Sequence, residues 1–245
     1  MKILVTAGPT REHIDPVRFL SNPSSGRMGF AIARAACSLG HEVVLVAGPV
    51  ALKTPKGVRR VDVVSARDML AAVEKERFDC FISTAAVADW RPAECASQKL
   101  KKGAMDGVLK LVRNPDVIKT ISTKVRSMRG KASRKILIGF AAETGDPTAE
   151  ASRKCREKGL DLVVANDVTA AGSGFGVKTN CVSFVWPDGR IDRHPLMSKD
   201  AVARRIVRAA ERMAERTTWS GGVTPHRRGA MRSSRPTEIH SFNVD

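Results

Sequence analysis

Three segments near the start of the sequence determine the fold: KILVTA at Lys2–Ala7, RMGFAIARAACSL at Arg27–Leu39 and HEVVLVA at His41–Ala47. The first and third segments are short, almost wholly apolar runs, which is typical of strands covered on both faces. The middle segment has helical periodicity and is followed by Gly40, a favoured residue just beyond a helix end. This order predicts a strand, a helix and a second strand running parallel to the first.

The same alternation continues along the chain. Further strands are expected at Phe78–Ala86, Lys135–Ala141 and Asp161–Ala165, and further helices at Ser65–Lys75, Asn114–Val125, Thr148–Lys158 and Lys199–Ala214. A hairpin of Cys181–Trp186 and Arg190–His194 is expected around the turn Pro187-Asp188-Gly189. The pattern predicts an α/β fold with a doubly wound, mostly parallel, Rossmann-like sheet, helices on both faces and a small β-hairpin extension.

Two helix starts are expected from capping residues. Ser65 with Asp68 has the spacing of a helix cap, and Asn114 before Pro115 predicts an N-cap followed by proline at the first helical position. Residues 1–214 are expected to form one domain. Residues 215–245, which are rich in Arg, Ser and Gly, are expected to be a disordered basic tail.

Composition limits the possible function. The chain has 245 residues, 42% of them apolar, and a formal net charge of +17, which suggests an anionic partner: a nucleic acid or phosphorylated small molecules. Five cysteines without CxxC spacing give little support to a zinc site or a disulfide framework. No secretion signal and no apolar stretch of about 20 residues occurs. The sequence therefore predicts a cytoplasmic protein with no membrane partner.

The segment Ser24–Gly29 (SSGRMG) directly precedes an expected helix. Glycines and free N–H groups at a helix start favour a phosphate or carboxylate, although an ordinary helix cap has the same residues. The segment is not a dinucleotide-binding motif, because GxGxxG does not follow the first strand, and no GxxxxGK[ST] loop occurs. A nicotinamide-dependent reductase is therefore the weaker alternative.

Three other segments carry candidate binding groups. In the loop Arg11–Pro23, an arginine can bind a phosphate with two parallel hydrogen bonds, and Asn22 can stabilise a carbonyl or oxyanion. The small residues of Thr84–Ala88 leave room for a flat ligand at the end of an expected strand, and Asp89 after them offers it a carboxylate. The lysines of Lys99-Leu100-Lys101-Lys102 suit either a solvated surface or a lid over a triphosphate. Few aromatic side chains are available for base stacking, which weighs against a nucleic-acid-binding module.

Seven segments, in the same order, resemble the phosphopantothenate–cysteine ligase family between residues 2 and 213. They are ILVTAGPTRE, DPVRFLSNPSSGRMGFAIA, AAVADWRP, KLKK, NPD, GFAAET and LDLVVANDV. The resemblance implies a cytoplasmic ligase domain over residues 1–214, in a stand-alone bacterial form whose decarboxylase partner is a separate protein.

The resemblance also implies a reaction. CTP, with Mg²⁺, converts the carboxylate of 4′-phosphopantothenate into an acyl-cytidylate, and the amine of cysteine then displaces CMP. It implies a homodimer in which the second subunit completes the pantothenate pocket, and it implies no nucleic-acid partner. The residues leave open the choice between CTP and ATP and the identity of the metal ligands.

The resemblance assigns roles residue by residue. Asn22, Arg18 and Lys99 are the expected catalytic residues: Asn22 holds the acyl carbonyl, Arg18 binds substrate across the site, and Lys99 covers the phosphates. The expected nucleotide-binding residues, besides Lys99, are Ser83, Thr84, Ala85, Asp89, Pro115, Asp116, Val117, Ile118, Phe140, Lys154 and Lys158. The expected loop around the activated group contains Ser24, Ser25, Gly26 and Gly29.

Overall fold

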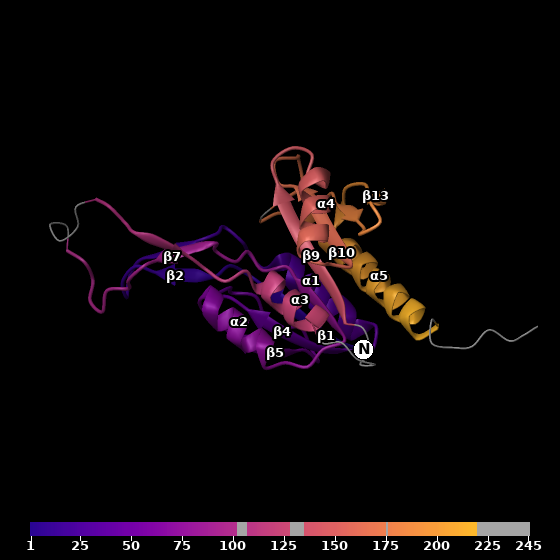
Figure 1. Cartoon of the computed structure of the whole chain (residues 1–245), viewed down its shortest axis with the longest axis horizontal. Coiled ribbons are helices and arrows are strands. Elements are labelled where there is room, and N and C mark those ends of the chain that lie inside the picture. Colours follow the sequence, from indigo (N-terminus) through magenta and orange to yellow (C-terminus); the bar gives the residue numbers. More distant parts are fainter. Residues whose placement is uncertain (102–106, 128–134, 175, 220–245) are drawn as a thin grey trace, which may run out of the picture.

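The computed structural model of this chain describes residues 1–101, 107–127, 135–174 and 176–219. A sheet of eight strands forms its centre (Figure 1). Its strand order is β13-β12-β10-β9-β6-β1-β4-β5. The parallel strands are β1 (Lys2–Ala7), β4 (Glu42–Ala47), β5 (Arg59–Asp62), β6 (Cys80–Ser83), β9 (Ile136–Glu143) and β10 (Leu162–Asp167). The antiparallel strands β12 (Ser183–Val185) and β13 (Ile191–Arg193) form the predicted hairpin at one edge.

The order of the parallel strands confirms the doubly wound prediction. From β1 the chain proceeds outward through β4 to β5, and it then crosses to β6 and proceeds the other way through β9 to β10. β1 and β6 are therefore neighbours from which the chain departs in opposite directions. Ligands of such sheets bind beyond the carboxyl ends of the strands at this point.

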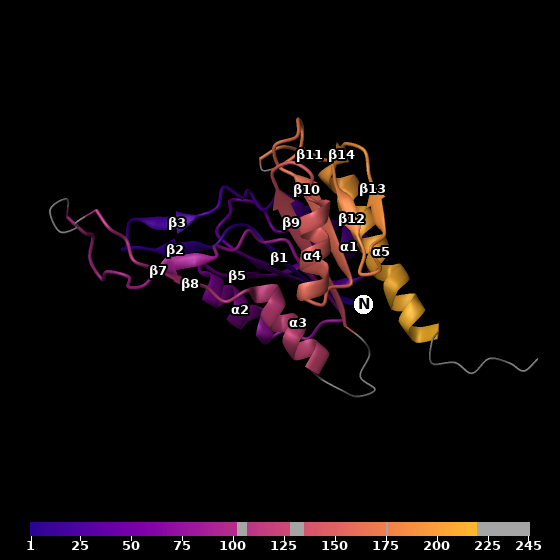
Figure 2. The ribbon, with the colours of Figure 1, turned by 45° about the horizontal axis from the view of Figure 1, so that its top comes forward.

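Helices cover both faces of the sheet, as predicted (Figure 2). α1 and α5 pack together on one face, whereas α2, α3 and α4 supply the buried side chains of the other. The five helices are α1 (Arg27–Ser38), α2 (Ala66–Glu74), α3 (Val117–Ser127), α4 (Thr148–Glu157) and α5 (Lys199–Trp219).

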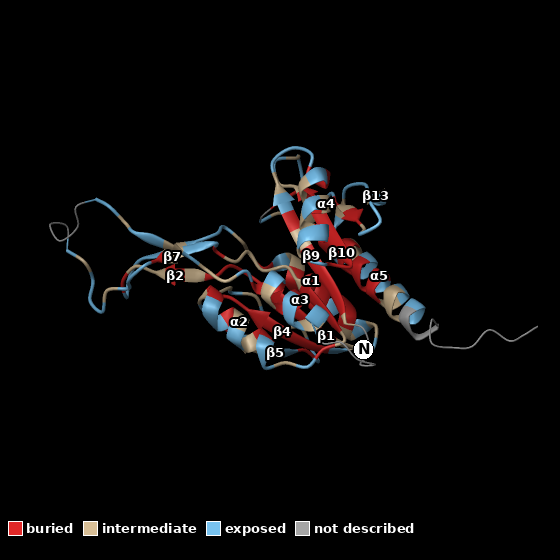
Figure 3. Cartoon of the chain, viewed as in Figure 1, coloured by how far each residue is buried: buried red, intermediate tan, exposed pale blue. Residues whose placement is uncertain are grey.

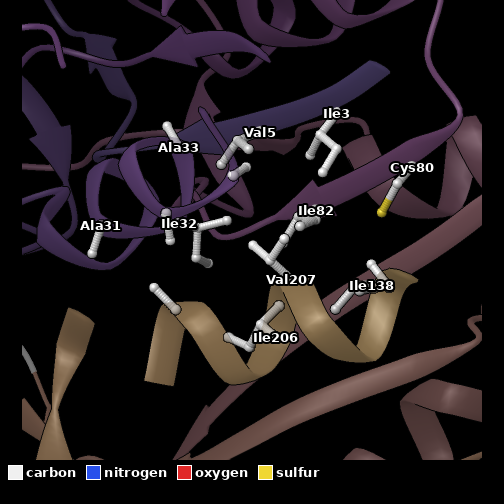
Figure 4. Close-up of a cluster of buried hydrophobic side chains, with 14 of the residues drawn as sticks. Ile3, Val5, Ala31, Ile32, Ala33, Cys80, Ile82, Ile138, Ile206 and Val207 are labelled. Atoms are coloured by element: carbon white, nitrogen blue, oxygen red, sulfur yellow. The ribbon is translucent and has the colours of Figure 1, made fainter. Parts of the chain in front are cut away.

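The buried side chains explain why the strands are continuously apolar. Ile3 and Val5 of β1 belong to the cluster under α1 and α5, whereas Leu4 between them belongs to the cluster on the opposite face. Figure 4 shows Ile206 and Val207 of α5 reaching toward the strands in the first cluster. Each such side chain is worth about 1.5–3 kcal/mol when fully buried. Burial is concentrated in the sheet and in the inner sides of its helices (Figure 3).

Two short antiparallel strand pairs project from the sheet as an arm, which we define as the described parts of residues 11–21 and 90–113 (Figures 1 and 2). The Glu12 carboxylate accepts a hydrogen bond from the Ala66 N–H at the start of α2 (2.9 Å), which ties the base of the arm to the domain. The pairs are β2 (Arg11–His13) with β3 (Phe19–Ser21), and β7 (Trp90–Pro92) with β8 (Leu111–Arg113). A third small pair, near the start of α5, contains β11 (Thr179–Asn180) and β14 (Met197–Ser198).

Most predicted elements are confirmed, including the cap of α2, where Ser65 and Asp68 exchange hydrogen bonds. The expected start of α3 at Asn114 is wrong. The helix begins at Val117 because the Asp116 carboxylate accepts the Lys119 N–H (3.0 Å), whereas the Asn114 side chain donates to the Ala88 carbonyl (2.8 Å).

Other boundaries also differ, such as the end of β9 at Glu143 rather than Ala141 and that of β10 at Asp167 rather than Ala165, and two of the differences have a structural reason. β6 ends at Ser83 rather than Ala86, because the chain leaves the sheet there and keeps only an isolated bridge between Pro9 and Ala86. α5 continues to Trp219 rather than Ala214, since Glu215 and Arg216 are good helix formers and no proline or glycine interrupts the chain before Gly221. Lys102 of the predicted lysine run lies outside the described residues, and so do residues 220–245 of the predicted tail.

We predict that Gly29→Ala destabilises the domain. A Cβ at Gly29 would lie 2.4 Å from the Ala7 Cβ and 2.5 Å from the Thr84 Oγ1, so α1 would have to move away from β1 and β6. Overpacking of this kind costs about 1–3 kcal/mol, measured as the free energy of unfolding in urea. As a control, Arg34→Ala removes an exposed ion pair with Asp200 and should cost less than about 1 kcal/mol. Equal losses for the two variants would contradict this packing argument.

Candidate functional site

Two adjoining cavities lie beyond the carboxyl ends of β1, β6 and β9. The large cavity has a volume of about 420 Å³ and the small cavity about 140 Å³. They share four lining residues, Ala85, Ala86, Phe140 and Ala142. The small side chains of three of these keep the two cavities in contact, so one extended ligand can occupy both.

The wall between the cavities is fixed by hydrogen bonds between the loops that follow β1 and β6. The Thr84 hydroxyl donates to the Thr6 carbonyl (2.6 Å), and the Ala86 N–H donates to the Gly8 carbonyl (2.9 Å). The buried Thr10 hydroxyl accepts the Ala88 N–H (3.0 Å). These bonds hold the loop after β6 against the loop after β1, and a bound ligand would therefore meet a preformed wall.

The large cavity has side chains of both charges, and its lysines are paired. The Lys154 ammonium lies 2.7 Å from a Glu143 carboxylate oxygen, and the Lys158 ammonium lies 2.7 Å from an Asp116 oxygen. The repulsion expected between two lysines four residues apart is thus offset by a separate carboxylate for each. Asp89 lines the same cavity, and its carboxylate has no partner in the part of the chain that the structure describes.

Asn22 lies at the boundary of the large cavity, where the chain returns from the arm. Its side-chain nitrogen donates to the carbonyls of Ala86 (3.2 Å) and Val87 (3.3 Å). These two bonds hold the amide against the loop that follows β6. Asn22 and Asp89, 67 positions apart in the sequence, are thereby brought to the same cavity.

The small cavity surrounds the start of α1. Gly26 precedes the helix with φ of 75°, a left-handed conformation that suits glycine, and no side chain caps the helix. The N–H groups of Arg27, Met28 and Gly29 have no acceptor among the residues with described positions. Free N–H groups at a helix start, together with the helix dipole, favour an anion.

Three polar residues of the small cavity were given no role in the sequence analysis. They are Asn166, which lies in β10, Asn180 and Lys199, which begins α5. The position of Asn166, directly after the apolar residues of β10, indicates a site residue, since polar side chains at strand ends line the sites of such sheets. Lys199 gives no comparable signal, because a lysine near a helix start ordinarily lies on the surface.

The arm brings together two other predicted residues. The buried Asp15 carboxylate accepts hydrogen bonds from the Arg18 side chain (2.9 Å at Nε) and from the Leu100 N–H (3.2 Å). The Arg18 guanidinium also donates to the Leu100 carbonyl (2.9 Å), which places it beside the segment that contains Lys99. The Arg18 guanidinium holds the pKa of Asp15 well below its usual range. Sequence reasoning missed Asp15, although an Asp before Pro and three residues before Arg indicates a local hydrogen-bonded turn.

The structure thus divides the predicted site residues into three groups. The large cavity is lined by Asn22, Ser83, Ala85, Asp89, Pro115, Asp116, Val117, Ile118, Phe140, Lys154 and Lys158. The small cavity is lined by Ser24, Ser25, Gly26, Gly29 and Thr84, and it shares Ala85 and Phe140. Arg18 and Lys99 lie on the arm and line neither cavity.

Within residues 1–101, 107–127, 135–174 and 176–219, no three His, Cys, Asp or Glu side chains cluster closely enough to hold a metal ion. None of the helices in these ranges combines the length and apolar character that crossing a membrane requires.

Comparison with known proteins identifies relatives over most of the chain. The family model of the DNA/pantothenate metabolism flavoprotein C-terminal domain matches residues 1–213. The coenzyme A biosynthesis bifunctional protein CoaBC of Vibrio parahaemolyticus is 46% identical over 217 residues, which are 87% of this chain and 52% of that protein. The chain thus spans about half the length of the curated relatives that it matches.

Solved structures give the same relationship. The crystal structure of the C-terminal domain of CoaBC has a TM-score of 0.72 and 43% identity, covering 88% of this chain and 96% of that domain. A Cab2 mutant in complex with phosphopantothenate-cysteine has a TM-score of 0.69 and covers 90% of this chain and 88% of its own, but at 15% identity it shows a likeness of fold alone. The family match over residues 1–213 and the high identity to CoaBC show that the chain belongs to the DNA/pantothenate metabolism flavoprotein C-terminal domain family.

Proposed function

We propose that this chain joins 4′-phosphopantothenate to L-cysteine, using CTP to activate the carboxylate, as a step of coenzyme A biosynthesis. The observation that carries the proposal is the pair of adjoining cavities, one with mixed charge and Asn22 at its boundary, the other around an uncapped helix start. The names of the relatives, which are coenzyme A biosynthesis proteins, support the same pathway.

The proposed chemistry needs positioning and charge neutralisation rather than a protein nucleophile. The substrate carboxylate attacks the α-phosphate of CTP, and the α-phosphorus–oxygen bond to pyrophosphate breaks. The cysteine amine then attacks the acyl carbon of the acyl-cytidylate and releases CMP. Fixed donors aimed at developing charge are effective in such acyl transfer, because they cost no reorganisation during the reaction.

The residues of the large cavity suit the nucleotide and the acyl group. The Asn22 side chain can donate an amide N–H to the acyl carbonyl if it gives up its hydrogen bond to one of the two backbone carbonyls, of Ala86 or Val87. Asp89, whose carboxylate is free of protein partners in the described structure, can accept hydrogen bonds from ribose or base. Lys154 and Lys158 can turn from their carboxylates to the phosphates, as the resemblance to the ligase family implies.

Magnesium is part of the proposal as the counter-ion of the nucleotide phosphates, whose charge it would neutralise. Mg²⁺ is commonly held by one or two carboxylates and by substrate phosphates rather than by a protein cage. Asp89, as the unpaired acid of the large cavity, fits that requirement, and the absence of a three-ligand cluster in the described residues is consistent with it.

The arm supports a homodimer in the same proposal. Its exposed apolar side chains Val17, Phe19, Trp90, Val108 and Leu111 suit burial against a second copy. Because Arg18 and Lys99 line neither cavity of their own chain, the arm of a partner subunit supplies one or both of them in this proposal. A cytoplasmic location, with no nucleic-acid or membrane partner, completes the proposal.

The direct test is incubation with 4′-phosphopantothenate, cysteine and either CTP or ATP, followed by detection of pyrophosphate, CMP or AMP, and the amide. We expect amide and CMP with CTP, in equal amounts. Amide and AMP with ATP would correct the choice of nucleotide, and no amide with either would reject the ligase. Release of the nucleoside monophosphate without amide would point to nucleotide hydrolysis instead.

We predict that Asn22→Ala lowers the rate of amide formation by about 10²–10³-fold, the usual effect of removing one donor to a developing oxyanion. The melting temperature should change little, since the side chain is exposed and its two bonds are to loop carbonyls. Asn22→Asp is the matched variant, because it keeps the size and removes the N–H donor. Full turnover by either variant would remove Asn22 from the mechanism.

We predict that Lys99→Gln lowers kcat/KM for CTP by about 10–100-fold, the effect expected when one charge-assisted hydrogen bond to a phosphate is lost. Lys101→Gln is the control, because it removes the same charge from the neighbouring exposed lysine. Equal, small effects of both changes would show that these lysines only form a solvated surface.

We predict that two inactive variants complement each other if the arm of one subunit serves the cavity of the other. Arg18→Ala and Asn22→Ala chains, unfolded together and refolded at equal concentration, should recover about a quarter of wild-type activity. This is because half of the dimers are then mixed and each mixed dimer has one intact site. No recovery, with mixed dimers confirmed by differently tagged chains, would place Arg18 and Asn22 in the site of one chain.

A further inference from the structure

Four consecutive backbone carbonyls, those of residues 86–89, follow β6, and each of them accepts a hydrogen bond from an asparagine. The Asn22 side chain donates to the first two, at 3.2 and 3.3 Å. Asn114 serves the other two: its side-chain nitrogen donates to the Ala88 carbonyl (2.8 Å), and its backbone N–H donates to the Asp89 carbonyl (2.8 Å). Two asparagines thus hold residues 86–89, which we call the wall segment, over their whole length.

The two asparagines have matching positions in the chain. Asn22 directly follows β3 and Asn114 directly follows β8, so each lies where one strand pair of the arm returns to the domain (Figure 2). The pairing of β7 with β8 ends at Trp90 and Arg113. The bond from the Asn114 side chain to the Ala88 carbonyl therefore extends beyond the strand pair, and closure of the hairpin does not require it.

The amide of Asn114 is itself held in one orientation. The Arg91 guanidinium donates to the Asn114 side-chain oxygen (3.2 Å) and also to the Arg113 carbonyl. A guanidinium has only donors, so the amide oxygen has to face Arg91 and the amide nitrogen has to face the Ala88 carbonyl. The orientation of the donor toward the wall segment thus follows from the charge beside it.

The effect of these bonds falls on Asp89. Just before it, the Ala88 N–H donates to the buried Thr10 hydroxyl (3.0 Å) and the Ala88 carbonyl accepts the Asn114 amide. The Asp89 carboxylate lines the large cavity without a partner among the described residues. The main chain is therefore fixed while the carboxylate stays available. A group fixed in this way binds a ligand without a further cost of ordering the chain.

We propose that Asn114 is a positioning residue, which holds the wall segment so that the Asp89 carboxylate is in place for the ribose or base of the nucleotide. This inference rests on the proposed function, in which Asn22 gives up one of its two bonds to the wall segment for the acyl carbonyl. Asn114 keeps the second half of the segment bonded at that stage. Its side-chain oxygen and nitrogen both contact protein groups, so its effect on the nucleotide comes through Asp89.

The test compares wild type with Asn114→Ala and Asn114→Asp, and the dissociation constant of CTP with Mg²⁺ is measured by calorimetry. We expect Asn114→Ala to weaken CTP binding by about 2–10-fold, the range for one neutral hydrogen bond. Asn114→Asp keeps the size and the acceptor for Arg91 but cannot donate to the Ala88 carbonyl, so it should weaken CTP at least as much. Unchanged CTP affinity in both folded variants would overturn the inference.

A double-mutant cycle with Asp89→Ala separates positioning from a general structural role. Asp89→Ala should weaken CTP binding by itself. Adding Asn114→Ala to that variant should change the affinity by less than about twofold, because no carboxylate remains to be positioned. If the two changes multiply as independent effects, Asn114 does not act through Asp89 and the positioning role is rejected.

Ser65→Ala is the control for stability. Ser65 caps α2 and lines neither cavity, and loss of such a cap lowers the stability of a domain. This variant should therefore have a lower melting temperature and a CTP affinity within about twofold of wild type. A loss of CTP affinity equal to that of Asn114→Ala would show a general effect of stability, contrary to the inference.

Arg91→Met keeps the test decisive if the Asn114 variants do not fold, because it removes the group that orients the Asn114 amide. It should weaken CTP in the same direction, and unchanged affinity in it would count against the inference. Amide hydrogen exchange in the ligand-free protein separates this result from failure of the proposed function, in which wild type forms no amide product. The Ala88 N–H should exchange about 2–10-fold faster in Asn114→Ala or Arg91→Met, and an unchanged rate would overturn the role of Asn114.

Discussion

The close approach of α1 to β1 and β6 is the constraint on which the rest of the molecule depends. At Gly29 the helix backbone comes so near to Ala7 and Thr84 that a Cβ would fall within 2.4–2.5 Å of their atoms. This contact places the N–H groups at the start of α1 beside the carboxyl ends of β1 and β6. From these two neighbouring strands the chain continues toward opposite edges of the sheet. The helix start and the strand ends therefore face the same space, and two cavities form there rather than a closed core.

Within that space the two adjoining cavities differ in their charged side chains. In the large cavity, Lys154 and Lys158 are paired with carboxylates, and Asp89 adds an unpaired negative group. A polar and nearly balanced lining of this kind suits a ribose, a base or a metal-bound phosphate. The small cavity contains Lys199 and Arg27, and its described lining has no acidic side chain. An extended ligand with a neutral part and an anionic end would match the two cavities in one orientation only.

The sequence predicted the strands and helices well where hydrophobic burial determines them. β1 is apolar on both faces because both faces are covered, and its bounds at Lys2–Ala7 agree with the prediction. The arm was not predicted, because each of its strands has only three residues, too few to show alternation. The start of α3 was misplaced because Asn114 bonds to a distant carbonyl at Ala88, which local capping rules do not include.

The gathering of predicted residues beyond the strand ends has a similar reason, whereas their roles stay predictions. Residues directly after strands, such as Asp89, were found because strand order places them at one edge. Lys199 was missed because its place in the small cavity arises from packing: α5 packs beside α1, and this brings a residue 170 positions after Gly29 into the same cavity. Hydrophobic periodicity locates each helix along the chain, but it does not determine which distant helix packs beside it. A residue at the start of α5 therefore cannot be assigned to this cavity from its local sequence.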